Sequence, residues 1–286
     1  MDLGLLASVL AALLWGGYLF ALKRFFSSYS ASVIIVVVHT IAIALYAPVA
    51  ATTVPSDSLE AILVGGPGLV VIVLANSLAF IAFIRAIDVG EISYVAPISK
   101  IVPVFVLPIE IVFLGEYLTP IQLSGVALAT LAVYVANFTG GSLLDPIRYA
   151  ARSRAAGFAL LSAALYAVGD VGRRVTLQEL ALPTELLVLG LLGGMALVLL
   201  PQAVRTWEGV SGDLPKFLAA GVLVAVAEHL TALAFSLTPA SIASPIINTQ
   251  AIVAVVLGGV LLREDAFRTR LVAAVLAVFG VALIAL

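Results

Sequence analysis

The segment Ser93-Tyr94-Val95-Ala96-Pro97-Ile98 reappears 148 positions later as Ser241-Ile242-Ala243-Ser244-Pro245-Ile246. The same offset aligns Glu116 with Glu264, each of which stands at the end of the apolar run that follows its segment. Self-similarity at a fixed offset is the mark of an internal repeat. The chain is therefore predicted to contain two copies of one unit, with a proline at the matched place in each copy.

The composition predicts the surroundings of the chain. Of its 286 residues, 63% are hydrophobic and 10% are charged, whereas soluble proteins carry about 25% charged residues. The sequence thus predicts a multi-pass protein of the cell (plasma) membrane, with the lipid bilayer as its surroundings. A net charge of −2 does not indicate a nucleic-acid partner. The absence of cysteine excludes disulfides and thiolate metal sites.

Ten apolar runs are long enough to cross a bilayer, which takes about 20 residues. Five lie in residues 1–139 and five in residues 155–286, with a linker at 140–154. Because each copy holds an odd number of crossings, the second copy is inverted relative to the first. The prediction is an all-α integral membrane protein with two inverted five-helix repeats. The helices are expected at 3–22, 31–50, 62–86, 92–114, 120–138, 155–174, 184–203, 215–236, 241–262 and 268–286.

The distribution of lysine and arginine predicts an orientation. Eleven cations follow the odd-numbered helices, whereas the opposite side holds only Arg173 and Arg174. Because cations accumulate on the cytoplasmic side of short-looped membrane proteins, this count favours both termini outside the cell.

Several features of the sequence occur together: Leu14-Trp15-Gly16, Lys23, Pro97, Gly115-Glu116 and Pro245. In combination they resemble the ten-helix EamA-type branch of the drug/metabolite transporter (DMT) superfamily. The resemblance covers nearly the whole chain. It implies two inverted repeats around a central cavity, and a permease for small metabolites that often works as an exporter. It also implies both termini in the cytoplasm, so the two orientations stay open.

A charge in the bilayer core costs several kcal/mol, so intramembrane charges are candidates for function. Lys100 shares a helix face with Ser93 and Pro97, and its counterpart in the second copy is Asn248. We expect Lys100 to attract a carboxylate or phosphate. The alternative is that Lys100 snorkels or forms a structural ion pair with Glu110 or Glu228.

Two amides and two prolines complete the predicted polar patch. Asn248 and Gln250 offer hydrogen bonds to a substrate. Pro97 and Pro245 interrupt helical hydrogen bonding, which frees backbone carbonyls to line a wet cavity and makes these helices candidates for gating.

Glu228 and His229 lie near the middle of one predicted helix. Neighbours on a helix point about 100° apart, so at most one of them faces the cavity. Either group is a candidate for coupling proton movement to transport. The alternatives are a structural bridge from Glu228 to Lys100 and a hydrogen bond from His229 to a neighbouring helix.

The remaining candidates line or stabilise the cavity. Trp15 and Tyr18 share a face of the first helix, and Tyr166 matches Trp15 in the second copy; these rings form a cavity wall or simply pack. Asn76 is a candidate hydrogen-bonding group of the cavity. His39 is expected to be satisfied between helices, although a substrate contact stays open.

Ser162, Tyr166, Asp170 and Arg173 fall on one stripe of the sixth predicted helix. The favoured interpretation of Asp170 is a terminal ion pair with Arg174, one turn later. No His-x-x-x-His spacing exists, so no metal site is predicted.

The predicted function is secondary transport of a small polar or amphipathic metabolite, such as an amino acid or related compound, by alternating access. The chain is not expected to be an enzyme or to need a cofactor. Its partners are a small-molecule substrate and lipid, and it is either a monomer or a homodimer. The alternatives are an ion channel or metal-ion permease, which needs rings of acids, and an intramembrane lipid-modifying enzyme, which needs a clustered catalytic constellation.

Overall fold

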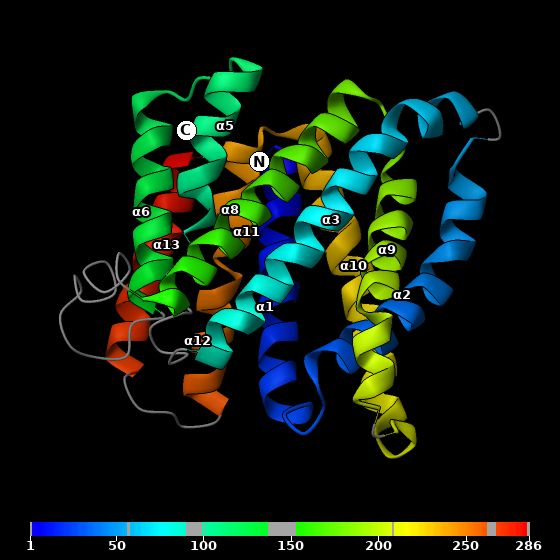
Figure 1. The fold of residues 1–286 in the computed structure, drawn as a ribbon. Helices are drawn as coiled ribbons and strands as arrows, with labels where there is room; N and C mark the ends of the chain where they lie inside the picture. The colour runs from blue at the N-terminus through cyan, green and yellow to red at the C-terminus, as the bar shows by residue number, and fades with distance from the viewer. Residues whose placement is uncertain are drawn as a thin grey trace.

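The computed structural model describes residues 2–55, 58–89, 99, 101–136, 153–207, 209–261 and 267–284, and these residues form helices without any strand (Figure 1). A helix pairs its backbone groups internally, as the bilayer requires. The first copy contains α1 (Leu3–Phe25), α2 (Ala31–Thr53), α3 (Leu59–Val89), α5 (Val102–Leu114) and α6 (Pro120–Ala136). The second contains α8 (Arg154–Arg174), a π-helical turn at Val175–Glu179, α9 (Thr184–Arg205), a 3-10 turn at Ser211–Asp213, α10 (Leu214–Leu237), α11 (Ala240–Asn248), α12 (Gln250–Leu261) and α13 (Phe267–Ile284).

Within the described residues, seven helical stretches are long and apolar enough to cross a membrane. Two shorter apolar helices, Val102–Leu114 and Pro120–Ala132, accompany them. This confirms an all-helical chain with many apolar spans. The count of ten crossings stays a prediction.

Equivalent helices of the two copies run in opposite directions. Figure 1 shows α1 descending from the N-terminus, whereas α8, drawn in green, rises. In the same view α2 rises and α9 descends. The second copy is thus inverted relative to the first.

The core lies between the two copies. The first helix of each copy packs on the third helix of the other, as α1 on α10 and α8 on α3. The second helices, α2 and α9, pack on each other, and so do α6 and α13. Exchanging the copies leaves this set of contacts unchanged, which is the pattern of an approximate two-fold axis. Any group at the centre is therefore surrounded by both copies.

The contact between α6 and α13 depends on glycine. A Cβ atom on Gly125 would lie 2.7 Å from the carbonyl oxygen of Gly280, and one on Gly280 would lie 2.7 Å from the backbone nitrogen of Ala129. Because backbone atoms cannot rotate away, only a residue without Cβ permits this approach.

The helix predicted over 241–262 is wrong as a continuous helix, because Thr249 separates α11 from α12. The Asn248 amide donates to the Ser244 carbonyl oxygen at 2.9 Å, and the Thr249 hydroxyl donates to the Ile246 carbonyl oxygen at 2.6 Å. Side chains that bond to helical carbonyls compete with the helix itself. Pro245, which lacks an N–H, cannot make the helical hydrogen bond to the Ser241 carbonyl and so weakens the preceding turn.

The first copy has a helix start at the matched position. α5 begins at Val102, which precedes the start of α12 at Gln250 by the repeat offset of 148 positions, and Ile101 lies outside the helix. The helix predicted over 92–114 does not run unbroken through Ile101, and residues 92–98 and 100 of that range lie outside the described residues. Pro97 and Lys100 lie outside the described residues.

Candidate functional site

Three charged side chains and a hydroxyl meet between α8, α10 and α11. An Arg173 Nη2 hydrogen donates to Glu228 Oε1 at 2.9 Å. Arg173 Nη1 lies 3.9 Å from Asp170 Oδ1, and Ser244 Oγ donates to Asp170 Oδ2 at 2.6 Å. The Arg173, Asp170 and Glu228 side chains are 11%, 14% and 5% exposed. We call these four residues the central polar cluster.

Helical spacing explains why these side chains converge. Asp170 and Arg173 are three positions apart on α8, so they share the face that was predicted for the stripe from Ser162. Glu228 reaches this face from α10 and Ser244 from α11. The Arg173 guanidinium group also lies over the Phe235 ring, with its carbon 5.9 Å from the ring centre.

The first copy contributes an aromatic residue beside the cluster. Trp15 Nε1 on α1 donates to Thr231 Oγ1 at 2.9 Å, and Thr231 is one turn beyond Glu228 on α10. Trp15 and Tyr18 make an edge contact with ring centres 5.7 Å apart. This contact confirms that the two rings share a face of α1, and the hydrogen bond brings that face to the second copy.

Arg174 forms a separate ion network at the end of α8. Its guanidinium nitrogens lie 2.5 Å from Glu116, 3.0 Å from Glu179 and 3.8 Å from Glu110. Glu116 and Glu110 belong to the first copy, whereas Glu179 follows α8. We call these four residues the Arg174 network, and it ties the copies together at one end of the bundle.

The Glu110 carboxylate of this network also holds the start of α11. It is fully buried and accepts the backbone N–H of Ala240 at 2.6 Å and that of Ser241 at 2.7 Å. The first N–H groups of a helix have no partner within the helix and carry partial positive charge, so a carboxylate stabilises them. Nearby, the Gln178 amide donates to the carbonyl oxygens of Phe235 and Thr238 at 2.7 and 3.0 Å.

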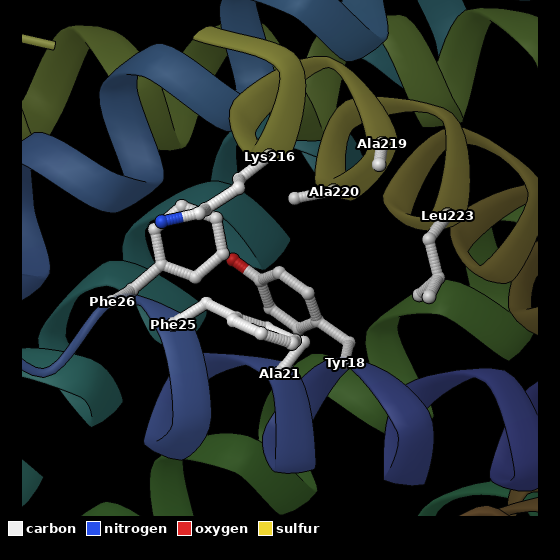
Figure 2. A pocket seen from close by; sticks show the side chains of 8 residues that line it. All are labelled: Tyr18, Ala21, Phe25, Phe26, Lys216, Ala219, Ala220 and Leu223. Carbon is white, nitrogen blue, oxygen red and sulfur yellow. The ribbon is translucent and has the colours of Figure 1, made fainter. Parts of the chain in front are cut away.

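An apolar pocket of about 190 Å³ lies at the other end of α10 (Figure 2). Figure 2 shows Tyr18, Phe25 and Phe26 facing α10, with the Lys216 side chain above them. The Lys216 ammonium lies 2.5 Å from Asp213 Oδ1. The lining is Tyr18, Ala21, Phe25, Phe26, Lys216, Ala219, Ala220 and Leu223. Tyr18 therefore extends from the Trp15 contact toward this pocket.

The structure corrects the pairing expected for Asp170. Arg173 and not Arg174 is its neighbour, because the Arg174 side chain points to the acids of its own network. Glu228 likewise pairs with Arg173. The alternative ion pair of Glu228 was with Lys100, and Lys100 lies outside the described residues.

The two histidines make interhelical contacts away from the cluster. His229 Nδ1 on α10 is 2.6 Å from the Tyr46 hydroxyl on α2, whereas its neighbour Glu228 joins the cluster. His39 Nδ1 is 3.2 Å from the Leu192 carbonyl oxygen on α9. Both contacts match the interhelical alternative named for each histidine. Among the described residues, no group of three or more His, Asp or Glu side chains could hold a metal ion.

The polar side chains predicted to line the cavity divide into two groups. Asn248 is joined to the cluster, because its Nδ2 lies 3.2 Å from Ser244 Oγ. Gln250 begins α12 and is partly buried. Asn76 instead donates to the Ile72 carbonyl oxygen at 2.9 Å and lies against Gly169 of α8. Tyr166 lies one turn before Asp170 on the same stripe.

Sequence reasoning missed the roles of Arg173, Ser244 and Glu110. The stripe on the sixth predicted helix signals that Arg173 faces the same way as Asp170. The serine in the repeated proline segment signals a polar face on α11. For Glu110, a fully buried acid in an apolar helix predicts a strong partner but not which one.

Comparisons with known proteins agree with this architecture. The model of the EamA-like transporter family matches residues 2–138 and 153–286. A solved crystal structure is similar with a TM-score of 0.79 over 98% of this chain and 95% of that one. At 16% identity, this likeness shows the fold alone. No curated protein matches the sequence.

Proposed function

The chain belongs to the EamA-like transporter family, and on this basis we propose that it is a secondary transporter of a small polar or amphipathic metabolite. It works by alternating access in the plasma membrane, and the substrate binds at the central polar cluster. Trp15, Tyr18 and Tyr166 form the aromatic wall, and Asn248 and Gln250 supply hydrogen bonds.

The observation that carries this proposal is the burial of three charges between helices of a membrane protein. Arg173, Asp170 and Glu228 lie within apolar spans, where ionised side chains are costly and are kept mainly for function. The cluster also lies beside Trp15 of the other copy. Inverted-repeat transporters build their sites at such places, because relative movement of the copies exposes the site to each side in turn.

In the proposed cycle, the Arg174 network closes one end of the site. It joins α5 and the Glu116 corner of the first copy to α8 of the second. Rocking of one copy against the other breaks these ion pairs and opens that end. In this proposed cycle, the intact ion pairs belong to the state in which the Arg174 end is closed.

We assign any proton coupling to Glu228, because it is the member of the Glu228-His229 pair that belongs to the cluster. Protonation of Glu228 removes the charge that holds the Arg173 guanidinium. Proton uptake would therefore loosen α10 from α8 and link movement of the copies to the proton gradient.

The test is transport in liposomes by the purified protein. A metabolite library is first screened for compounds that raise the melting temperature, since a ligand that binds only the folded state stabilises it. We expect counterflow of such a compound by the wild type, at a rate that an imposed proton gradient changes. Glu228→Gln is expected to lower the rate at least tenfold and to remove the gradient effect. Glu60→Gln, the same change at an exposed position of α3, should leave both unchanged.

Two results would contradict the proposal. One is a bound compound that the wild type does not carry across the bilayer. The other is a Glu228→Gln variant that transports like the Glu60→Gln control, which would remove the cluster from the transport site.

A further inference from the structure

We infer that the central polar cluster selects amphipathic amines, with the Asp170 carboxylate contacting the protonated nitrogen of the substrate. This inference rests on the proposed function, since it names the substrate class of the same site. It starts from the unequal number of positive and negative charges in the cluster.

Two carboxylates of the cluster share one guanidinium. Arg173 is hydrogen-bonded to Glu228 at 2.9 Å, but its nearest nitrogen is 3.9 Å from Asp170, beyond hydrogen-bonding distance. Among the described residues, Arg173 is the only cation paired with Asp170. Asp170 otherwise accepts a hydrogen bond from the neutral Ser244 hydroxyl. Counted over the described residues, the cluster therefore carries one more negative than positive charge, and a substrate cation would balance it.

Two buried hydroxyls on the helices that form the cluster also lack partners, which points to a polar ligand independently of this charge count. Ser241 Oγ, one turn before Ser244 on α11, is buried and has no hydrogen-bond partner among the described residues. The same holds for Ser162 Oγ, two turns before Asp170 on the α8 stripe. Buried hydroxyls usually have partners, so a group that completes their hydrogen bonds is expected nearby. An ammonium group has three donors and matches acceptors of this kind.

The repeat explains why the rest of the ligand should be apolar. At the repeat offsets of 151 and 148 positions, Asp170 corresponds to Leu19 of α1 and Glu228 corresponds to Phe80 of α3. The first copy therefore presents apolar groups where the second presents acids. Trp15 and Tyr166 add aromatic faces, which attract both apolar groups and cations. A site with acids on one side and apolar groups on the other fits an amine with a hydrophobic body.

The test compares three probes that share a phenylethyl body: phenethylamine, N-acetylphenethylamine and 3-phenylpropionate, which are cationic, neutral and anionic at pH 7. Binding is measured by calorimetry on the purified full chain in detergent. We expect the wild type to bind phenethylamine at least tenfold more tightly than either of the others. Asp170→Asn, which keeps an acceptor for Ser244, should abolish that preference. Asp88→Asn, the same change at an exposed position of α3, should retain it.

Three results would overturn the inference. They are no binding of phenethylamine, equal or tighter binding of the neutral or anionic probe by the wild type, and an unchanged preference in Asp170→Asn. The wild-type comparison stands even if the variant fails to fold. Counterflow separates this inference from the proposed function. If the neutral or anionic probe is transported and the amine is not, only the amine assignment fails, whereas binding without any transport rejects the transporter.

Discussion

Arg173→Met is expected to destabilise the protein strongly and to abolish transport. The substitution leaves Glu228, 5% exposed, and Asp170, 14% exposed, without their shared cation. Removing one partner of a buried ion pair costs about 3–5 kcal/mol, because an uncompensated charge stays behind. The free energy of unfolding, followed by helical signal during denaturation from mixed micelles, measures the loss.

Two controls assign this effect to charge. Arg24→Met removes an exposed arginine at the end of α1 and should cost less than about 1 kcal/mol. Combining Arg173→Met with Glu228→Gln should recover part of the lost stability, since one uncompensated carboxylate is gone. If Arg173→Met were as stable as Arg24→Met, the ion pairs of the cluster would not exist in the folded protein.

Glu110→Ala is expected to release the start of α11. The change leaves the backbone N–H groups of Ala240 and Ser241 buried without an acceptor. Each such group costs about 1–3 kcal/mol, so the total loss is about 2–6 kcal/mol. Hydrogen exchange locates the effect: the Ala240 and Ser241 amides should exchange much faster, whereas amides in the middle of α2 should not change more than the global loss of stability requires.

The control for Glu110 is its neighbour in the Arg174 network. Glu116→Ala removes an acid that is 35% exposed and holds only a side chain, so a smaller loss is expected. Glu110→Gln keeps one acceptor oxygen and should fall between the two alanine variants. Unchanged protection of Ala240 and Ser241 in Glu110→Ala would show that the carboxylate does not hold this helix.

Much of the fold could be predicted because membrane helices are specified locally. A run of about 20 apolar residues predicts a span without knowledge of its neighbours. The matched segments at Pro97 and Pro245 revealed the repeat, and the odd number of spans per copy predicted the inversion visible in α1 and α8. These inferences use only the composition, the offset between the repeated segments and the odd number of spans in each copy.

The partners at the site could not be predicted, because they depend on how helices face each other. Sequence spacing allows Asp170 to pair with a cation three or four positions later, and only packing on α10 selects Arg173. The break at Thr249 was missed for a similar reason: the sequence does not say whether its hydroxyl bonds to a helical carbonyl or to another group. A pair of Glu110 with Lys100 was only an alternative in the sequence, whereas the structure shows that Glu110 accepts backbone N–H groups, which leave no mark in the sequence.

One introduced thiol tests directly whether the centre of the bundle is reached from each side of the membrane in turn. The chain has no cysteine, so Ser162→Cys supplies its only thiol, at a buried position on the Asp170 stripe whose hydroxyl makes no hydrogen bond with the described residues. Labelling is measured in liposomes with a membrane-impermeant thiol reagent added to one side at a time. With alternating access, the thiol is expected to react from either side, and bound substrate is expected to slow both reactions. Labelling from one side only, or from neither side with and without substrate, would contradict it.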